Sequence, residues 1–176
     1  MDAVSEQLSQ AVTVAVAVDN NEKESRMFRH VLVPIDGSEL SRTAVKHAVC
    51  FAKDVKGRVT FLFVMKDYHV SMLHSEDDEE NIDPIAPNDF TDAMRTHADR
   101  ILQAARAEAG AEGVPVDTVA VTNDEPHKAI IEIALSRSAD VIFMASHSRR
   151  GLASLLLGSV TQKVLSNSKI PVLVVR

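Results

Sequence analysis

The segment His30-Val31-Leu32-Val33-Pro34-Ile35-Asp36-Gly37-Ser38 decides the fold. Its apolar run from Val31 to Ile35 is short and unbroken, which predicts a β-strand buried on both faces. Asp36 and Gly37 are turn residues, and Ser38 can cap a following helix. The residues that share one face of that helix are Leu40, Ala44, Ala48, Phe51 and Ala52. A buried strand followed directly by an amphipathic helix is the repeating unit of an α/β protein.

The same alternation continues along the chain. Further strands are predicted at residues 59–64, 116–121, 141–144 and 171–175. Between them, helices are predicted at residues 90–109, ended by Gly110 at its C′ position, from Pro126 onward, and at residues 159–165. Short apolar strands separated by amphipathic helices predict a doubly wound α/β fold, with one parallel sheet covered on both faces.

Composition narrows the class of protein further. The 176 residues are 45% hydrophobic but only 4% aromatic, so the core is expected to be aliphatic. The formal net charge of −6 argues against a non-specific nucleic-acid binder and against an anionic membrane surface. The single cysteine, Cys50, lies in an apolar helical stretch and is predicted to be a buried structural thiol. One cysteine allows no intrachain disulfide, which fits a reducing compartment.

Residues 1–26 are interpreted as an N-terminal extension and residues 27–176 as the domain. The extension has no basic segment typical of a secretory signal, and its apolar run at 11–18 is far shorter than the roughly 20 residues of a membrane span. A cytoplasmic location is therefore expected. The run at 11–18 either adds an edge strand to the sheet or is disordered, and composition leaves both open. A second polar stretch at 66–88, acidic at 75–83, is predicted to be a mobile, solvated loop.

Ligands of doubly wound sheets bind at the carboxyl ends of the strands. The sequence Leu157-Gly158-Ser159-Val160-Thr161-Gln162 places a helix start after the fourth predicted strand. Ser159 and Gln162 have the spacing of a capping box, which is a purely structural interpretation. The functional interpretation is a phosphate site, because a helix start presents unpaired N–H groups and partial positive charge. Gly158 would let a phosphate approach the backbone, and Arg149 and Arg150 supply positive charge nearby.

Asp36 follows the first strand and can accept hydrogen bonds from a ribose hydroxyl or a purine amine. It is equally suited to an Asx turn in Asp36-Gly37-Ser38. His147 lies in the candidate site and is interpreted as a loop or phosphate contact. The seven histidines show no paired metal-ligand spacing, and no dinucleotide, P-loop or nucleophile-elbow motif occurs. No catalytic residue and no metal site is therefore assigned.

Two segments resemble the universal stress proteins. They are Val31-Leu32-Val33-Pro34-Ile35-Asp36-Gly37-Ser38 and the stretch from Ala139-Asp140-Val141-Ile142-Phe143-Met144-Ala145-Ser146-His147 to Pro171-Val172-Leu173-Val174-Val175. Nucleotide-binding members carry Gly-x2-Gly-x9-Gly-Ser/Thr after the fourth strand. Here Ala145 and Ser148 replace the first two glycines, and Gly158-Ser159 matches the last pair.

The resemblance implies a five-stranded parallel sheet of order 3-2-1-4-5 and a homodimer through the last strand, Val172–Val175. It also implies an ATP or AMP site, with Mg²⁺ accompanying the nucleotide. In that site Pro34, Asp36 and Val64 would hold the adenosine end. The middle would be lined by Met144, Ala145, His147, Ser148 and Arg149, and the phosphates would be held by Gly158, Ser159, Val160 and Thr161.

Three functions remain open from the sequence. The first is a stress-response regulatory protein that binds adenine nucleotide with little or no turnover. The second is a universal stress protein that binds no nucleotide and acts through protein contacts, which the two replaced glycines favour. The third is a weak ATP hydrolase of the related α-hydrolase type. Those enzymes carry a Ser-Gly-Gly-x-Asp-Ser loop where this chain has Pro34 to Ser38.

Overall fold

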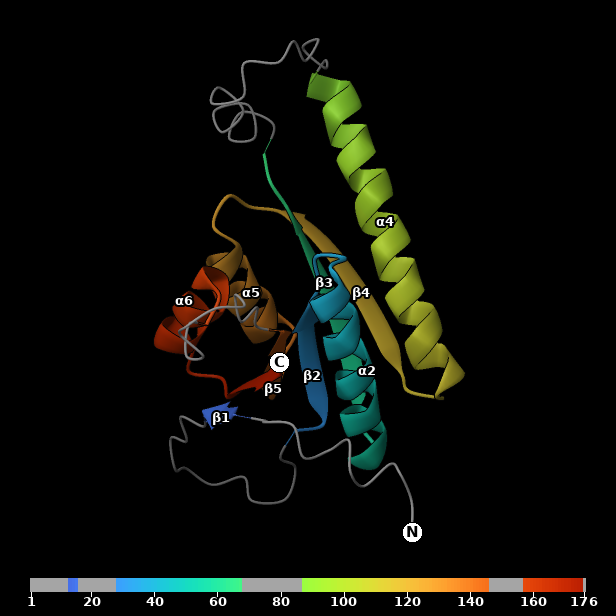
Figure 1. Ribbon diagram of the computed structural model, residues 1–176, viewed down its shortest axis with the longest axis vertical. Helices are drawn as coiled ribbons and strands as arrows, with labels where there is room; N and C mark the ends of the chain where they lie inside the picture. Colours follow the sequence, from blue (N-terminus) through green and yellow to red (C-terminus); the bar gives the residue numbers. More distant parts are fainter. Residues whose placement is uncertain (1–12, 16–27, 68–86, 146–156, 176) are drawn as a thin grey trace.

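The computed structural model describes residues 13–15, 28–67, 87–145 and 157–175 (Figure 1). The elements in chain order are β1 (Thr13–Ala15), β2 (His30–Pro34), α2 (Glu39–Asp54), β3 (Arg58–Met65), α4 (Pro87–Ala111), β4 (Val116–Thr122), α5 (Pro126–Ser136), β5 (Val141–Ala145), α6 (Ser159–Asn167) and β6 (Val172–Val175). The strands and helices predicted from hydrophobic spacing are all present, with bounds that differ by one to three residues. The acidic segment 75–83 lies outside the described residues.

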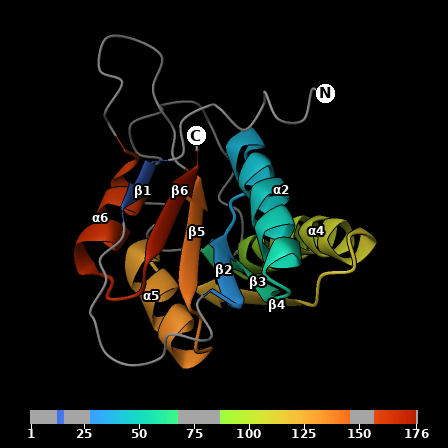
Figure 2. The ribbon, with the colours of Figure 1, turned by 90° about the horizontal axis from the view of Figure 1, so that it is seen from below.

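One sheet of order β1-β6-β5-β2-β3-β4 forms the centre of the molecule (Figure 2). The pairs β6–β5, β5–β2, β2–β3 and β3–β4 are all parallel. Strands β2 to β6 therefore have the expected order 3-2-1-4-5, which confirms the doubly wound fold. The sixth strand is an addition: β1 pairs antiparallel with β6, with Thr13 opposite Val174 and Ala15 opposite Val172.

Helices cover both faces of the sheet (Figure 2). Helices α2 and α4 pack on one face, where Val31, Val33 and Phe61 point into the core. Helices α5 and α6 pack on the other face, where Leu32 and Leu62 are buried. Successive residues of β2 thus enter opposite cores, and both are fully buried. This burial explains the unbroken apolar run that the sequence shows there.

Helix α4 ends later than expected. Gly110 was predicted to terminate it, but α4 runs to Ala111 and the positive φ, 72°, belongs to Gly113. The Gly113 N–H donates to the Gly110 carbonyl and the Val114 N–H donates to the Ala109 carbonyl, each at 3.0 Å. These two bonds satisfy carbonyls of the last helical turn, so Gly113 rather than Gly110 is the C′ residue.

Cys50 is exposed, so the prediction of a buried thiol was wrong. The inner face of α2 is formed by Ser41, Ala44, Val45, Ala48, Val49 and Ala52. Position 50 follows Val49 by about 100° around the helix and lies two positions before Ala52, so it points outward. An apolar neighbourhood in the sequence did not distinguish the two sides of this helix.

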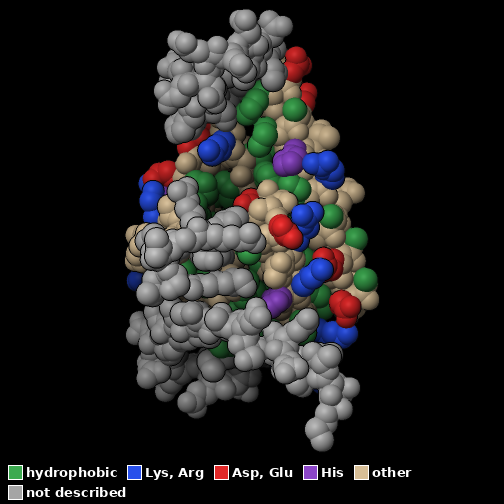
Figure 3. All heavy atoms as spheres, viewed as in Figure 1, with side chains coloured by type: hydrophobic (Ala, Val, Ile, Leu, Met, Phe, Trp, Pro, Cys, Tyr) green, Lys and Arg blue, Asp and Glu red, His purple; other side chains and the backbone are tan. Residues whose placement is uncertain are grey.

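The outer face of α2 and α4 carries charged side chains of both signs, interspersed over the surface (Figure 3). An exposed ion pair joins the ends of the two helices, with Lys53 Nζ 2.7 Å from Glu112 Oε2. Such an exposed pair is screened by solvent and contributes little to stability, so the buried side chains below hold these helices on the sheet. Within the described residues, no helix combines the length and apolar character that a membrane crossing needs.

Candidate ligand-binding site

A cavity of about 320 Å³ opens at the carboxyl ends of β2, β3 and β5. The chain leaves β2 toward β3 on one side of the sheet and returns through β5 on the other. Connections therefore depart in opposite directions at β2, and a crevice forms between them. The cavity lies where the sequence predicted a site.

The structure brings together most of the predicted site residues around this cavity. Those that line it are Pro34, Asp36, Val64, Met144, Ala145, Gly158, Ser159, Val160 and Thr161. His147, Ser148 and Arg149, with Arg150, lie outside the described residues. Segments more than a hundred residues apart in the sequence thus meet at one place.

The start of α6 forms the polar end of the cavity. Gly158 is the N-cap residue, with extended backbone angles of φ −55° and ψ 146°, and Ser159 is the first helical residue. The predicted capping box is therefore wrong, because the N-cap position is held by a glycine, which has no side chain to cap the helix. The first helical hydrogen bond runs from the Gln162 N–H to the Gly158 carbonyl at 2.9 Å. The N–H groups of Ser159, Val160 and Thr161 precede it and have no partner within the helix.

Gly158 is not required by packing within the described residues. A Cβ at this position would meet Thr161 Oγ1 at 4.0 Å, an ordinary contact distance, and its φ is negative. The protein would therefore accept a side chain here. A ligand seated on the helix start would not, because the side chain would project where the ligand approaches the backbone.

Thr161 has a structural role that its predicted phosphate contact did not include. Its side chain is buried, and its hydroxyl donates to the Ala145 carbonyl at 3.3 Å. This bond fixes the first turn of α6 against the end of β5. The hydroxyl hydrogen is thereby occupied, so donors to an anion would come from the backbone of α6.

Asp36 begins a tight turn on the opposite wall. Its Oδ1 accepts the Ser38 N–H at 2.9 Å, and Gly37 takes a φ of 81°, so the Asx turn expected as one interpretation is present. Partial burial raises the pKa of Asp36, but hydrogen bonds from Ser38 and Ser41 outweigh it and hold the pKa below its ordinary value. The carboxylate is therefore ionised at neutral pH and presents an acceptor beside the cavity.

The start of α2 is capped and rigid. Ser38 Oγ accepts the Ser41 N–H at 3.1 Å, and Ser41 Oγ donates to the Ser38 carbonyl at 3.0 Å. Both serines line the cavity, as does Pro126 in the first turn of α5. The first turns of α2, α5 and α6 therefore all border this one cavity, and each helix start contributes partial positive charge.

Several lining residues were missed by the sequence analysis, namely Ile35, Ser38, Ser41, Leu62, Pro126 and Ile130. Leu62 is the register partner of Pro34 across β2 and β3, and it lies two residues before Val64 on the same strand. The two-residue periodicity of a strand therefore carried a signal for Leu62. Ile130 is a buried residue of α5 and reaches the cavity through the packing of that helix.

A second hollow, of about 570 Å³, lies on the other side of the same turn, between α2 and α4. It shares Asp36 and Ser38 with the first cavity, and Arg42, His97 and Arg100 lie at its rim. It reaches neither β5 nor α6, so it contains none of the predicted phosphate-binding residues. Among the residues that the structure describes, no cluster of His, Cys, Asp or Glu side chains could hold a metal ion.

Comparison with known proteins gives a consistent result. Universal stress protein YxiE of Bacillus subtilis is 32% identical over 156 residues, covering 85% of this chain and all of that protein. The solved structure of MJ0577 is 29% identical with a TM-score of 0.65, covering 85% of this chain and 96% of that chain. MJ0577 is a universal stress protein of Methanocaldococcus jannaschii.

A third similar protein is a universal stress protein solved in complex with cAMP. It is 24% identical with a TM-score of 0.60, over 85% of this chain and 98% of that chain, a likeness that concerns the fold alone. Residues 27–176 match the universal stress protein family as a whole. On this match and the identity to YxiE, the chain belongs to the universal stress protein family.

Proposed function

We propose that this chain is a stress-response regulatory protein that binds an adenine nucleotide with little or no turnover. The observation that carries the proposal is the cavity at the carboxyl ends of β2, β3 and β5, bordered by three helix starts. Its volume of about 320 Å³ falls within the roughly 300–1,000 Å³ typical of small-molecule sites. The fold neighbour in complex with cAMP supports the choice of an adenine nucleotide.

The two ends of the cavity differ in the way that a nucleotide requires. The apolar side chains of Leu62, Ile130 and Met144 suit an adenine ring. The ionised carboxylate of Asp36 could accept a hydrogen bond that a ribose hydroxyl donates. The backbone N–H groups at the start of α6 suit a phosphate. Pro34 and Val64 would contact the adenosine, while Met144 and Ala145 would lie beside the ribose and α-phosphate. His147, Ser148 and Arg149 are kept as proposed contacts from the sequence.

The proposal of slow turnover is based on the charges of the side chains that line the cavity. Among the described lining residues, Asp36 is the only one with a charged side chain, and it is tied into its turn by the Ser38 N–H. Phosphoryl transfer needs groups that position an attacking water and stabilise developing charge. The two proposed ligands are ATP and AMP, and Mg²⁺ would bind together with ATP through its phosphates. We propose that the protein is located in the cytoplasm.

Calorimetric titration of ATP, with and without Mg²⁺, and of AMP tests the proposal. We expect the full chain to bind and Gly158→Val to lose binding while remaining folded, because a Cβ there makes only an ordinary contact with the described residues and would project toward the ligand. Gly110→Val is the matched control. A Cβ at Gly110 meets no described atom within 4 Å, and Gly110 lies in α4, away from the cavity. Mass spectrometry of small molecules released from the purified protein adds an independent measurement.

The variant Ser148→Gly restores a glycine of the nucleotide-binding pattern. If it binds and the unaltered chain does not, this chain has lost nucleotide binding and protein contacts become its function. If Gly158→Val binds as well as the unaltered chain, the phosphate site has been placed wrongly. Release of inorganic phosphate at an enzymatic rate would favour the hydrolase instead.

A further inference from the structure

The outer edge of β6 carries a strand, β1, that is not part of the five-stranded parallel sheet. Strand β6 pairs with β5 on its inner side, from Val172 opposite Ile142 to Val175 opposite Ala145. Its other side is paired with β1 of the same chain, in antiparallel register. Both edges of β6 are therefore occupied.

Without β1, the outer edge of β6 would be a strong site of strand addition. It would expose the outward-facing N–H and C=O groups of a strand of four consecutive apolar residues, Val172–Val175, in which alternate residues face outward. Open apolar edges of this kind pair with other chains unless something covers them. A second copy of the same strand is a suitable partner, because two identical strands related by a two-fold axis run antiparallel and can form a continuous sheet.

β1 and a second copy need the same hydrogen-bonding groups, so the two pairings exclude each other. β1 contributes only three residues, Thr13 to Ala15, whereas β6 of a second copy would offer four. A three-residue pairing is short and can be displaced. Its advantage is that β1 belongs to the same chain, which gives it a high effective concentration at the edge.

We propose that β1 is a removable cover on the outer edge of β6 and controls the pairing of that edge with a second copy of the chain. While β1 is in place, the chain is a monomer. When β1 is released, two copies pair through Val172–Val175. Both copies must be uncovered, so a cover that is open in about one chain in ten weakens the dimer about a hundredfold.

Proline substitutions in the full chain test the cover. Proline lacks the N–H that a sheet ladder needs, and successive residues of an edge strand direct their N–H groups to opposite sides. One of Val14→Pro and Ala15→Pro therefore removes an N–H aimed at β6. We expect that variant to sediment as a dimer at concentrations where the unaltered chain is a monomer. Val14→Ala keeps the N–H and is the matched control.

Cysteine pairs determine which chain supplies β1. The register partners Thr13 with Val174 and Val14 with Leu173 are each replaced by cysteines, in a Cys50→Ser background that removes the exposed thiol. Neighbouring pairs in an antiparallel ladder alternate between hydrogen-bonded and closer non-hydrogen-bonded geometry, so one pair is well placed for a disulfide. We expect that pair to crosslink within one chain and the crosslinked protein to be a monomer.

Four results would overturn the proposal. They are an unaltered chain that is already a dimer, a crosslink between chains instead of within one, proline variants that stay monomeric, and proline variants that form aggregates instead of dimers. Circular dichroism of each variant separates release of β1 from unfolding of the domain. None of these measurements depends on nucleotide, so failure here leaves the proposed function standing.

Discussion

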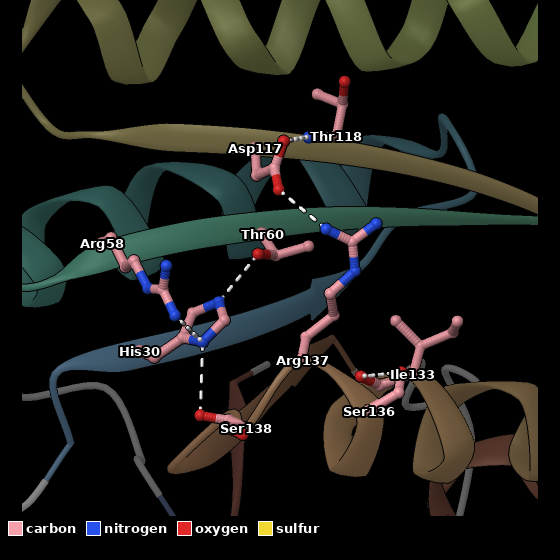
Figure 4. A network of polar contacts seen from close by, with 9 residues as sticks. All are labelled: His30, Arg58, Thr60, Asp117, Thr118, Ile133, Ser136, Arg137 and Ser138. Atoms are coloured by element: carbon pink, nitrogen blue, oxygen red, sulfur yellow. Dashed lines mark hydrogen bonds and ion pairs between the residues drawn. The ribbon is translucent and has the colours of Figure 1, made fainter.

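His30 is a buried imidazole at the amino end of β2, in contact with three residues, Arg58 and Thr60 on β3 and Ser138 after α5 (Figure 4). Its Nε2 lies 2.7 Å from Thr60 Oγ1 on β3, and its Nδ1 lies 3.1 Å from Arg58 Nη2 and 3.3 Å from the Ser138 carbonyl. The guanidinium can only donate, so its bond to Nδ1 requires a neutral ring with the hydrogen on Nε2. The Thr60 oxygen then accepts that hydrogen.

Protonation of His30 would disrupt this arrangement. A second hydrogen on Nδ1 removes the acceptor of Arg58 and places two positive charges together. Burial, followed by the charge of Arg58, lowers the pKa of His30 below its ordinary value of about 6.5, although Asp140 and the Ser138 carbonyl act in the opposite direction. Asp140 is itself tied to the strand, because its Oδ2 accepts the His30 N–H at 2.9 Å.

We therefore expect stability to fall in mild acid. The unfolded chain takes up a proton at His30 near pH 6.5, whereas the folded chain does so only at lower pH. The stabilising contribution is complete above pH 6.5 and is lost as the pH falls from there through the folded pKa, by about 1.4 kcal/mol for each unit of pKa difference. Urea unfolding at a series of pH values measures this dependence.

The variant His30→Gln separates the contribution of His30 from the pH dependence that the other histidines cause. Glutamine can still reach Thr60, but it does not titrate. We expect its unfolding free energy to depend less on pH between 7.5 and 5. Nuclear magnetic resonance titration of the His30 ring in the unaltered protein measures the folded pKa directly. A ring that titrates at or above 6.5 would contradict the prediction.

At the scale of elements, α2, α4 and α5 end in the same way. In each, the residue after the cap has a positive φ, namely 52° at Lys56, 72° at Gly113 and 53° at Ser138. In α2, the Lys56 N–H donates to the Lys53 carbonyl and the Gly57 N–H donates to the Ala52 carbonyl. Equivalent pairs of bonds end α4 and α5. These are Schellman motifs, in which glycine is the favoured residue at C′.

Lys56 and Ser138 therefore carry backbone strain that Gly113 does not. A left-handed conformation costs a non-glycine residue about 1–2 kcal/mol, and a substitution to glycine removes this cost. Part of that stabilisation is lost, because glycine makes the unfolded chain more flexible. We expect Lys56→Gly to raise the free energy of unfolding by up to about 1 kcal/mol. Lys56 is exposed, so little packing is lost.

The reverse substitution, Gly113→Ala, is the matched control for that experiment. An added Cβ there meets no described atom within 4 Å, so any loss of stability reports the positive φ, less the gain from a stiffer unfolded chain. Denaturant unfolding should show stabilisation for Lys56→Gly and destabilisation for Gly113→Ala. Equal stability of all three proteins would mean that these helix ends are not strained.

The elements show where sequence reasoning succeeds and where it does not. Hydrophobic spacing predicted the five parallel strands, because burial on both faces requires unbroken apolar runs. The spacing did not show whether Gly110 or Gly113 ends α4, because the backbone hydrogen bonds of the last helical turn determine which residue takes the C′ position. Ser159 had the right capping chemistry, but Gly158 has the extended backbone angles. β1 stayed undecided because its pairing depends on the free edge of β6, which lies at the far end of the chain.

The candidate site could be predicted only in part for a related reason. Residues that directly follow a strand, such as Asp36 and Ala145, are placed by the rule that ligands bind at the carboxyl ends of strands. Leu62 could have been found from its two-residue spacing to Val64, whereas Ile130 enters the cavity through helix packing, which becomes visible only in three dimensions. The hydrogen bond of Thr161 to the Ala145 carbonyl likewise depends on how α6 docks on β5.

At the scale of the whole molecule, the cavity lies across the centre of the sheet. Its wall takes Leu62 and Val64 from β3 on one side of β2 and Met144 and Ala145 from β5 on the other. Strands β2 and β5 are paired at two register positions, Val31 with Val141 and Leu32 with Ile142. The two arms of the sheet therefore diverge toward their carboxyl ends, where the cavity opens.

A nucleotide bound in this cavity would contact both arms at once, so we expect it to stabilise the domain as one unit. The free energy gained is RT ln(1 + [L]/Kd), or about 2.7 kcal/mol at a hundredfold excess over Kd. Thermal unfolding with ATP should show one transition at a higher Tm, and hydrogen exchange should slow in β2, β3 and β5 together with the start of α6. Gly158→Val should keep its own Tm unchanged by ATP. Slower exchange confined to α4 and the adjacent turn would instead place the ligand in the hollow between α2 and α4, where Arg42 and Arg100 lie.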